Sequence, residues 1–529
     1  MRRPLGAQIS HMLAARGVDT IFGIPGVHNQ EMYRGIAEAG ITHVLALHEQ
    51  GAGFMADGYA RASGRPGVCY VITGPGLTNV LTPLGQAYSD SVPVLAISSC
   101  LDETAATRGQ LHQMKDQRAA AETVCDWSEE ARTAEAAYAL IDRALMEFDT
   151  RRQRPKHLSV PIKLLEAEAP SPPARANDEL AGDIPRDELA VHRIAEALKA
   201  ASRPVLILGG GATIGASLYP KLAEAAGAAV FMSYAGRGIM PPGHPLSFGA
   251  TLARPESARV LGQADLIVVA GCELAEVDLW RTGLGADTPI LRLDIDPQVL
   301  ASQQRPQDRV ILGDCYEIME AVLDALAGHT PAAGWSSDEI AATRRRWRAE
   351  VDAERPGIVP VADALRACLP EGTMLYSDMT QFAYAAKEVW DIDRPGHWHH
   401  PTGFGTLGYA LPAAIGGAVA RKGAPTLAIA GDYGFQYTLQ ELGTAVELGL
   451  PLPIFLWDNG KLKEIEDSMI AAQIPPNAVV ARNPDFVALA RAYGAHGVAP
   501  ETLSEMQEAV TTAFEADGPT LIYVTPEIG

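Results

Sequence analysis

The most informative stretch of this chain is TLAIAGDYGFQYTLQELGTAVELGLPLPIFLWDNG at 426–460, whose residue order is typical of a strand, a turn, a helix and a second strand. The apolar run 426–430 predicts a short β-strand, which the Gly-Asp-Tyr-Gly turn at 431–434 ends. Apolar residues at helical spacing predict a crossover helix over 435–448, and a second strand is predicted over 453–457. In such a parallel βαβ unit both turns open at the carboxyl edge of the sheet, where ligands bind.

Two side chains with oxygen ligands are expected to meet at this edge. Asp432 follows the first strand and Asn459 follows the second. A few hard oxygen ligands beside a helix N-terminus suit a Mg²⁺ ion that keeps other positions for substrate phosphates. The alternative is an ordinary pair of turns, because short Gly-Asp turns are common.

Length, charge and cysteine usage indicate what kind of protein this is and which partners they exclude. With 529 residues we expect three or four domains of about 150 residues each. A net charge of -21 argues against a nucleic-acid or anionic-membrane surface, so the expected partners are small molecules or copies of the chain itself. No apolar run reaches the roughly 18 residues of a membrane span, and the N-terminus lacks a signal-peptide pattern, so we expect a cytoplasmic protein. The six cysteines form no CxxC pair, which argues against a zinc site or a disulfide framework.

Two breaks divide the chain. Residues 166–185 are rich in Pro and small residues, and residues 328–337 form a second polar break before a charged helix. We therefore predict three α/β domains, each with a doubly wound parallel sheet, over 1–165, 186–327 and 345–529.

The middle domain shows a Rossmann-like pattern. Buried strands are predicted over 204–208, 264–271 and 289–295, and Gly209, Gly210 and Gly211 follow the first of them. A lone glycine cluster after a strand is a weak signal for a bound nucleotide.

The first domain carries a candidate acid or base. Glu49 follows a strand predicted over 41–47 and precedes a helix, so it is expected in a low-dielectric cleft that tends to raise a carboxyl pKa. The alternative is a helix-capping acid. A further strand over 68–73 leads into the turn Gly74-Pro75-Gly76, which can approach an anion or a planar ring closely or can be tight packing only.

Several motifs together carry a family resemblance. The segments FGIPG at 22–26, HEQGAGFMADGYAR at 48–61, ITGPGLTN at 72–79 and DSVPVLAIS at 90–98 resemble the pyrimidine-binding domain of the acetolactate synthase and 2-oxoacid decarboxylase family, which uses thiamine diphosphate. The resemblance covers essentially the whole chain. It implies a pyrimidine-binding domain, a central Rossmann-like domain and a diphosphate-binding domain in that order.

The stretch 426–460 resembles the diphosphate motif of this family, which begins Gly-Asp-Gly and ends in a pair of Asn. Two positions depart from the motif, because Tyr433 replaces its second Gly and Asp458 replaces its first Asn. The resemblance implies that Asp432 and Asn459 bind the metal, and Lys461 is placed in the same set.

The resemblance also implies the cofactor contacts. Glu49 would hydrogen-bond the aminopyrimidine ring, the backbone of Gly405 would contact its amine, and Leu407 would prop the cofactor in a bent shape. The implied cofactor-binding set is Pro25, Glu49, Thr73, Asn79, Thr380, Gln381, Gly405, Leu407, Asp432, Tyr433, Gly434 and Asn459. Family members differ in whether the central domain binds FAD, ADP or nothing, and we expect a structural domain without a flavin. The family's sites form between subunits, which implies a homodimer or a homotetramer.

The implied reaction is the decarboxylation of a small-molecule 2-oxoacid, followed by release of an aldehyde or by addition to a second carbonyl. Aldehyde-forming relatives often carry an adjacent His pair after the strand that ends near Ser99, but residues 100–110 contain no His. They also often carry an Asp where this chain has Val27. His28 and His112 are candidate catalytic residues for proton relay, with a structural role for each as the alternative.

The segment after Asn459 bears on the substrate. The stretch 431–466 looks like the decarboxylases of 5-guanidino-2-oxopentanoate, the 2-oxoacid of arginine. A guanidinium group favours a bidentate carboxylate partner, so Glu464 or Glu466 is the expected contact, and Gln113 is placed with them in the substrate set. Carboxylates that merely face solvent are the alternative. The alternative activities are acetolactate synthesis and a flavin-dependent oxidation.

Overall fold

The computed structural model describes residues 2–174, 186–285, 287–302, 304–480 and 482–529. Contacts within the chain define two compact units. The first comprises residues 1–181, 368–380 and 400–529, and the second comprises residues 182–367 and 381–399. Most of the predicted linker at 166–185 lies outside the described residues.

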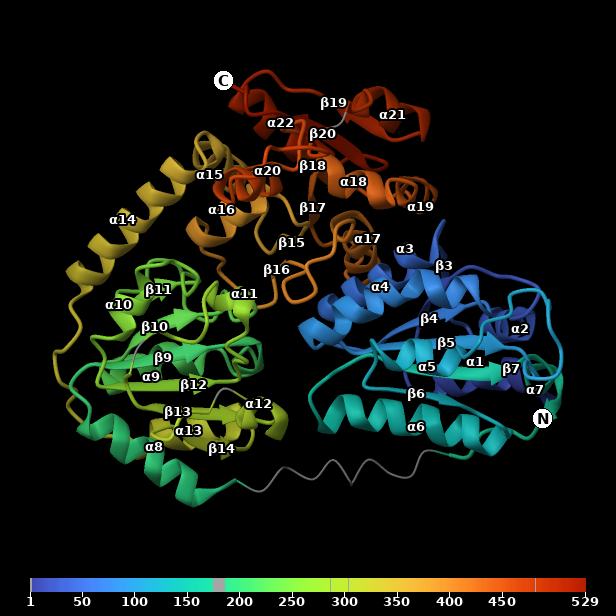
Figure 1. Ribbon diagram of the computed structural model, residues 1–529, viewed down its shortest axis with the longest axis horizontal. Coiled ribbons are helices and arrows are strands. Elements are labelled where there is room, and N and C mark those ends of the chain that lie inside the picture. The colour runs from blue at the N-terminus through green and yellow to red at the C-terminus, as the bar shows by residue number, and fades with distance from the viewer. Residues whose placement is uncertain (1, 175–185, 286, 303, 481) are drawn as a thin grey trace. The chain divides into compact units, whose positions relative to one another are not determined.

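The N-terminal part of the first unit is built on a parallel sheet of six described strands in the order β3-β2-β4-β5-β7-β6. The central strands β2, β4, β5 and β7 are buried throughout, as expected where helices cover both faces, whereas the edge strands β3 and β6 are partly exposed. Figure 1 shows α6 on one side of the sheet and α3 and α4 on the other. The elements are β1 Arg3–Pro4, α1 Leu5–Ala15, β2 Thr20–Gly23, α2 Gln30–Glu38, β3 Thr42–Leu45, α3 Glu49–Ser63, β4 Gly67–Val71, α4 Pro75–Asp90, β5 Val94–Cys100, α5 Gln117–Glu122, β6 Trp127–Glu130, α6 Ala134–Thr150, β7 Lys156–Pro161, α7 Ile162–Glu166 and β8 Glu168–Ala169.

The C-terminal part of the first unit is built on a second parallel sheet, in which this unit supplies β15-β17-β18-β20-β19 in that order. The strands predicted over 426–430 and 453–457 are confirmed as β17 and β18, which pair in parallel. The elements are β15 Met374–Ser377, α17 Ala410–Ala420, β17 Thr426–Gly431, α18 Asp432–Thr438, α19 Glu441–Glu447, β18 Pro453–Trp457, α20 Lys463–Ala471, α21 Phe486–Ala492, β19 His496–Val498, α22 Leu503–Ala513 and β20 Thr520–Val524.

The single crossover helix predicted over 435–448 is wrong, because α18 and α19 are separate helices. Two side chains on either side of the break make hydrogen bonds outside the helix. The Thr438 hydroxyl donates to the Gly408 carbonyl at 2.8 Å, and the Glu441 carboxylate accepts the backbone N–H of His48 at 2.9 Å. Apolar spacing does not reveal such bonds, so the periodicity continued through the break.

The two parts of the first unit pack through α3 and α17, whose backbones touch. A Cβ on residue 58 would lie 2.0 Å from the Ala413 carbonyl oxygen, and a Cβ on residue 416 would lie 1.9 Å from the Met55 carbonyl oxygen. Only glycine allows this approach. The Tyr409 hydroxyl also donates to the buried Asp57 carboxylate at 2.7 Å. The carboxyl edges of the two sheets are therefore held in one packed body.

The second unit contains a third parallel sheet, with six described strands in the order β11-β10-β9-β12-β13-β14. The central strands predicted over 204–208, 264–271 and 289–295 are confirmed (Figure 1). The elements are α8 Glu188–Ala200, β9 Pro204–Leu208, the 3-10 helix Gly210–Ala212, α9 Leu218–Ala226, β10 Ala229–Met232, β11 Ser247–Gly249, α10 Ser257–Leu261, β12 Leu266–Ala270, α11 Glu276–Leu279, β13 Ile290–Asp294, α12 Pro297–Ala301, β14 Arg309–Leu312, α13 Cys315–Ala325, α14 Ser337–Glu354, α15 Ile358–Cys368, α16 Gln381–Val389 and β16 Trp398–His399. The predicted α/β class with three doubly wound parallel sheets is confirmed. Among the described helices, none is long and apolar enough to cross a membrane.

Candidate active site

Glu49 is the first residue of α3 and is 9% exposed. The His48 side chain caps this helix by accepting the Gln50 N–H, so Glu49 is not the cap. Its Oε2 instead accepts a hydrogen bond from Asn79 Nδ2 at 2.9 Å. A Cβ on residue 76 would lie 3.3 Å from Glu49 Oε1, so the carboxylate lies beside the turn Gly74-Pro75-Gly76. The structure thus brings together Glu49 and Asn79, two residues of the predicted cofactor-binding set.

The turn that contains Pro25 packs near the same place. A Cβ on residue 26 would lie 2.2 Å from Ile72 Cδ1, and a Cβ on residue 76 would lie 2.8 Å from Ile72 Cγ2. Ile72 therefore separates the two turns. Asn29, which is fully buried, holds the first turn by accepting the Gly26 N–H at 2.7 Å. The sequence analysis missed Asn29, since nothing in its spacing distinguishes it from a loop residue.

Thr73 is buried behind these turns. Its hydroxyl hydrogen-bonds the Ser99 hydroxyl at 2.8 Å, and the Gly74 N–H donates to Gln117 at 3.1 Å. The hydrogen bonds of Thr73 and Gly74 fix the segment after β4, where the glycine turn begins. Thr73 also lines a cavity of about 420 Å³, together with the loop from Cys100 to Ala105.

His28 and His112, which are far apart in sequence, face each other. Their ring centroids are 4.9 Å apart in an edge-to-face arrangement. In the described part of the chain the Nδ1 atoms of both rings are buried without a hydrogen-bond partner. Burial, together with His112, lowers the pKa of His28. The carbonyl oxygen of His112 would lie 2.3 Å from a Cβ on residue 74, so the pair adjoins the glycine turn next to Glu49.

The side chain of Gln113 stabilises the loop that follows β5. Its Nε2 donates to the carbonyl oxygens of Thr104 at 3.1 Å and Thr107 at 2.8 Å. The amide therefore holds the loop that follows β5, and its contact with substrate stays a prediction.

Asp432 is the first residue of α18 and is 4% exposed. Asn483 Nδ2 donates to Asp432 Oδ2 at 2.7 Å and to Asp458 Oδ1 at 2.9 Å. Burial and the neighbouring Asp458 raise the pKa of Asp432 to about 6. Two carboxylates this close disfavour one another's charge, and a bound cation relieves that repulsion.

The other metal candidates lie beside this pair. Asn459 Oδ1 accepts the Lys461 N–H at 3.3 Å, and Lys461 Nζ contacts Glu466 at 3.1 Å. Since an ammonium group cannot donate a lone pair, Lys461 can serve a metal only through its carbonyl oxygen. Within the described residues no three His, Cys, Asp or Glu side chains form a metal-binding group. The residues present therefore fit a Mg²⁺ site with few protein ligands, in which phosphate oxygens take the other positions.

The glycines of the 431–434 turn are required by polar neighbours. A Cβ on residue 431 would lie 3.0 Å from Thr380 Oγ1, and a Cβ on residue 434 would lie 2.6 Å from Asp378 Oδ2. Asp378 accepts the Gly408 N–H at 2.9 Å, and burial raises its pKa to about 6. The 405–408 segment is thereby tied to this turn.

Most of the remaining predicted cofactor residues precede this turn in the sequence. Gly405 adopts a φ of 68°, which favours glycine, and Leu407 and Tyr433 are half-buried. Thr380 belongs to the first unit, whereas Gln381 begins α16 in the second unit. Within the first unit, Thr380 thus lies beside Gly431, the residue before Asp432, and a Cβ on residue 405 would lie 3.6 Å from Met379 Cε.

The predicted substrate carboxylates are on α20. None of the described side chains of this helix is buried. Glu466 Oε2 lies 3.1 Å from Lys461 Nζ and 3.5 Å from Lys463 Nζ, so its carboxylate is already paired with cations. Glu464 lies in the first turn of the same helix.

Glu441 is a buried residue that the sequence analysis missed. It is 0% exposed, and its carboxylate accepts the N–H groups of Leu47 at 3.1 Å and His48 at 2.9 Å. Burial raises its pKa to about 7. Because it binds the backbone just before Glu49, it joins the C-terminal part of the unit to the start of α3.

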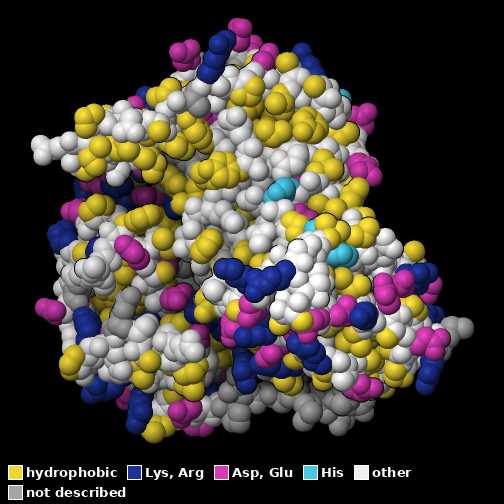
Figure 2. Space-filling view, turned by 45° about the vertical axis from the view of Figure 1, so that its right-hand side comes forward, with side chains coloured by type: hydrophobic (Ala, Val, Ile, Leu, Met, Phe, Trp, Pro, Cys, Tyr) yellow, Lys and Arg dark blue, Asp and Glu magenta, His cyan; other side chains and the backbone are white. Residues whose placement is uncertain are grey.

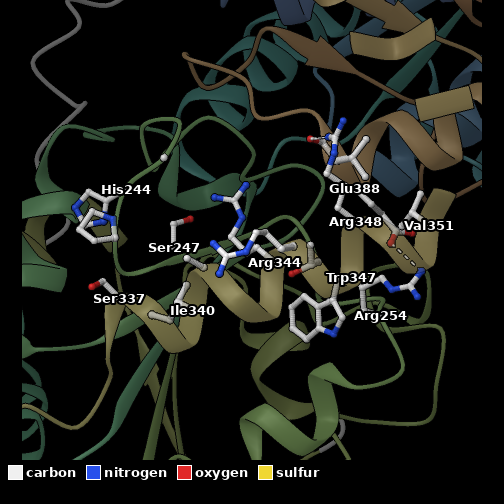
Figure 3. Close-up of a pocket in the computed structure, with 16 residues that line it drawn as sticks. His244, Ser247, Arg254, Ser337, Ile340, Arg344, Trp347, Arg348, Val351 and Glu388 are labelled. Atoms are coloured by element: carbon white, nitrogen blue, oxygen red, sulfur yellow. Dashed lines mark hydrogen bonds and ion pairs between the residues drawn. The ribbon is translucent and has the colours of Figure 1, made fainter. Parts of the chain in front are cut away.

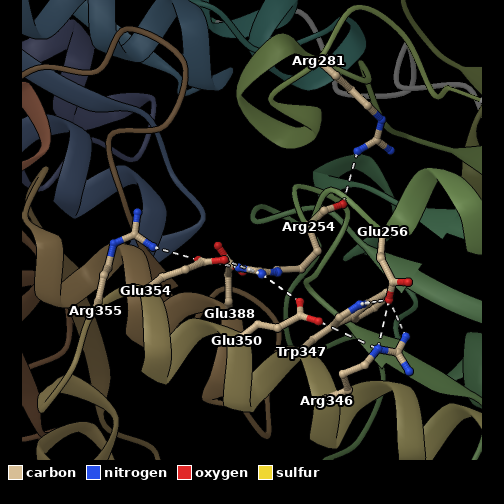
Figure 4. Close-up of polar contacts among 9 residues, drawn as sticks. All are labelled: Arg254, Glu256, Arg281, Arg346, Trp347, Glu350, Glu354, Arg355 and Glu388. Atoms are coloured by element: carbon tan, nitrogen blue, oxygen red, sulfur yellow. Dashed lines mark hydrogen bonds and ion pairs between the residues drawn. The ribbon is translucent and has the colours of Figure 1, made fainter. Parts of the chain in front are cut away.

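The second unit has a cavity of its own, of about 320 Å³, lined by α14 and by residues around β11 (Figure 3). Beside it, Arg254 is 5% exposed and forms ion pairs with Glu350, Glu354 and Glu388 (Figure 4). These bonds join α14 and α16 to the segment after β11. None of the predicted site residues lines this cavity.

The glycine turn after β9 is closely packed. A Cβ on residue 209 would lie 2.0 Å from the Gly271 carbonyl oxygen, and a Cβ on residue 211 would lie 2.9 Å from Gly271 Cα. The glycines therefore allow the ends of two strands to touch. This close packing is a sufficient reason for the glycine cluster, and a bound nucleotide phosphate is not needed to explain it.

Comparison with known proteins agrees with this geometry. Residues 3–120 match the family model described as "Thiamine pyrophosphate enzyme, N-terminal TPP binding domain", residues 191–322 match its central domain, and residues 378–524 match its C-terminal TPP binding domain. The Pseudomonas aeruginosa protein named "Probable 2-ketoarginine decarboxylase AruI" is 43% identical over 98% of this chain and 93% of its own length.

Two Escherichia coli K12 proteins are more distant. The large subunit of acetolactate synthase isozyme 1 is 28% identical over 99% of this chain and 94% of its own length. The large subunit of isozyme 2 is 29% identical over 98% of this chain and 95% of its own length. The predicted resemblance is confirmed, and the chain belongs to the thiamine pyrophosphate enzyme family.

Proposed function

We propose that this protein decarboxylates 5-guanidino-2-oxopentanoate (2-ketoarginine) with thiamine diphosphate and Mg²⁺ and releases CO₂ and an aldehyde. The observation that carries the proposal is the 43% identity, over almost the full length of both chains, to a relative named for that activity. A weaker similarity to acetolactate synthases is shared with the family at large.

The residues at the two sheet edges of the first unit fit the cofactor. Asp432 and Asn459, with the carbonyl oxygen of Lys461, would hold Mg²⁺, and Glu49 would hold the aminopyrimidine ring. Thiamine diphosphate, when bound, supplies a nucleophilic carbon and an electron sink for loss of CO₂. Asn79 fixes the Glu49 carboxylate at 2.9 Å, which keeps it aimed at one place.

Proton transfer to the product favours aldehyde release. His28 and His112 form in space the imidazole pair that aldehyde-forming relatives carry as adjacent residues, with centroids 4.9 Å apart. Their buried Nδ1 atoms have no other hydrogen bond in the described part of the chain, so they are available to a reacting group. A carbon that is protonated promptly cannot add to a second carbonyl, so the pair supports decarboxylation over carboligation.

The substrate guanidinium would bind on the α20 side. Glu466 is held by Lys461 and Lys463, and a guanidinium that forms a bidentate pair can replace one ammonium there. Glu464 and Gln113 complete the proposed substrate set.

The assembly we propose is a homodimer or a homotetramer. Exposed apolar side chains of the first unit include Val27 at 60%, Leu111 at 62% and Phe404 at 50% exposure, and apolar patches are visible in Figure 2. Apolar surface of this kind is typical of contacts between subunits. We further propose the three-domain division at 1–165, 186–327 and 345–529, with no flavin in the central domain.

The test is product analysis with two substrates. CO₂ and organic products are measured from 5-guanidino-2-oxopentanoate and from pyruvate under identical conditions. We expect faster CO₂ release from the guanidino acid and an aldehyde as product. A preference for pyruvate with acetolactate as the product would favour the alternative activity, and a yellow protein with a flavin spectrum would favour the third.

A further inference from the structure

Asn483 belongs to none of the recognised motifs, yet its side chain lies between the two carboxylates of the proposed metal site. Its Nδ2 donates to Asp432 Oδ2 at 2.7 Å and to Asp458 Oδ1 at 2.9 Å. The residue lies in the segment between α20 and α21, far along the chain from the Gly-Asp turn. One amide therefore bridges the end of β17 and the end of β18.

The orientation of this amide is fixed by a third residue. Gln436 Nε2 donates to Asn483 Oδ1 at 3.2 Å and to the Asp432 carbonyl oxygen at 3.0 Å. Because Asn483 Oδ1 is occupied by a donor, its Nδ2 must face the carboxylates. The amide is thus held in the orientation that its two hydrogen bonds require.

Asp458 explains why such a donor is needed. This carboxylate is 8% exposed and accepts the Gly460 N–H at 2.8 Å and the Tyr523 hydroxyl at 2.9 Å. It replaces the first Asn of the diphosphate motif, and an Asn there would bring an amide donor of its own. A carboxyl group brings no amide donor, so the carboxyl oxygens of Asp432 and Asp458 share the N–H donors of Asn483 Nδ2.

We infer that Asn483 is a positioning residue of the metal site, whose amide replaces the donor that the motif's first Asn would supply. By holding Asp458 through Oδ1, it keeps the second carboxylate fixed and leaves Asp432 to present an oxygen to Mg²⁺. The inference rests on the proposed cofactor, but it concerns how this chain compensates for its own departure from the motif.

The test is a double-mutant cycle read by calorimetric titration of Mg²⁺ into the full-length protein with thiamine diphosphate present. Asn483→Ala should weaken Mg²⁺ binding by roughly 10- to 100-fold, the usual cost of losing a residue that orients a metal ligand. In the Asp458→Asn background the same change should cost less than about threefold, because the motif's own amide is restored. Asn483→Ser, which keeps a donor on a shorter side chain, should lie between.

Asn477→Ala is the matched control, because Asn477 is an exposed Asn of the same segment whose side chain donates to the Pro475 carbonyl oxygen. Its Mg²⁺ affinity should equal that of the wild type. Thermal unfolding without Mg²⁺ shows whether each variant is folded. An equal loss in both backgrounds, or no loss for Asn483→Ala and Asn483→Ser, would overturn the inference. A wild-type protein that binds neither Mg²⁺ nor thiamine diphosphate would instead reject the proposed function.

Discussion

Each sheet edge of the first unit holds a carboxylate that is fixed by an amide, but the surroundings of the two carboxylates differ. At the N-terminal edge Asn79 holds Glu49 at 2.9 Å beside the glycine turn, which the backbone of the half-buried His112 adjoins, and His112 packs against the half-buried His28. At the C-terminal edge Asn483 holds Asp432 at 2.7 Å, and a second carboxylate, Asp458, shares the same amide. A carboxylate held by an amide near two imidazole side chains suits proton transfer, whereas two carboxylates that share one amide suit a cation.

The two sheet edges therefore have different expected roles. We expect the C-terminal edge to anchor the cofactor through a metal, and the N-terminal edge to act on protons after the cofactor is bound. Substitutions at the first should change affinity, and substitutions at the second should change rate.

The largest effect is expected from Asp432→Ala. Removing an anionic ligand of the metal should nearly abolish cofactor retention, and with it all activity. Calorimetric titration of thiamine diphosphate in the presence of Mg²⁺ measures this. Asp467→Ala, which changes a half-exposed carboxylate on α20, is the control and should bind normally. Unchanged affinity in Asp432→Ala would remove the anchoring role from this edge.

Glu49→Gln should give the opposite pattern. The variant should keep most of its cofactor affinity, because Glu49 is not among the proposed metal ligands, but it should lose at least ~10²-fold in turnover, a typical contribution of a general acid or base. The check is a comparison of kcat with the cofactor dissociation constant in the same preparation. Near wild-type turnover would refute the assignment of Glu49.

A smaller effect is expected from His112→Gln. With His28 still present, we expect turnover to fall by roughly tenfold, which corresponds to about 1.4 kcal/mol, and a larger share of carboligation product to appear. Cofactor affinity should not change. The control is His496→Gln, since His496 is exposed and paired with Asp517. An unchanged rate and product ratio would leave His112 with a structural role only.

Glu441→Gln tests the hydrogen bonds by which Glu441 joins the two parts of the first unit. Its effect should be on the free energy of unfolding. The pKa of Glu441 in the folded state, about 7, lies above the ordinary glutamate pKa of 4.5, so the folded state keeps a proton that the unfolded state loses as pH rises through this range. The contribution of Glu441 to the free energy of unfolding is therefore present below about pH 4.5 and is lost by about pH 7. The total loss is at most about 3 kcal/mol.

Chemical unfolding at several pH values measures this change. The wild type should lose stability relative to Glu441→Gln between pH 4.5 and 7, and the two curves should run parallel above that range. Parallel curves over the whole range would show that Glu441 has the same pKa in the folded and unfolded states, which would contradict the prediction.

Much of the fold could be predicted because its strands are short apolar runs between turn residues. The strand over 453–457 is bounded by Pro451 and by Asp458, and the structure gives the same limits. The helix over 435–448 was predicted as one element, because Leu439 and Leu442 continue the apolar spacing across the break. Hydrogen bonds from Thr438 and Glu441 to distant segments decide that break, and periodicity contains no information about them.

The candidate site was predictable only where a motif is local in sequence. Asp432 and Asn459 follow the neighbouring strands β17 and β18, so strand order alone predicts that they lie at the same edge of the sheet. Asn483 comes from a segment without any periodic pattern, and Glu441 reaches across to the other sheet. The contact of His28 with His112 depends on how two loops pack, which no spacing in the sequence encodes.

The most direct test of the account is the cofactor dependence of CO₂ release from 5-guanidino-2-oxopentanoate. Protein freed of metal and cofactor by a chelator should release no CO₂, should stay inactive with either component alone, and should regain activity when thiamine diphosphate and Mg²⁺ are both added. Turnover without thiamine diphosphate, or no turnover with both present, would contradict it.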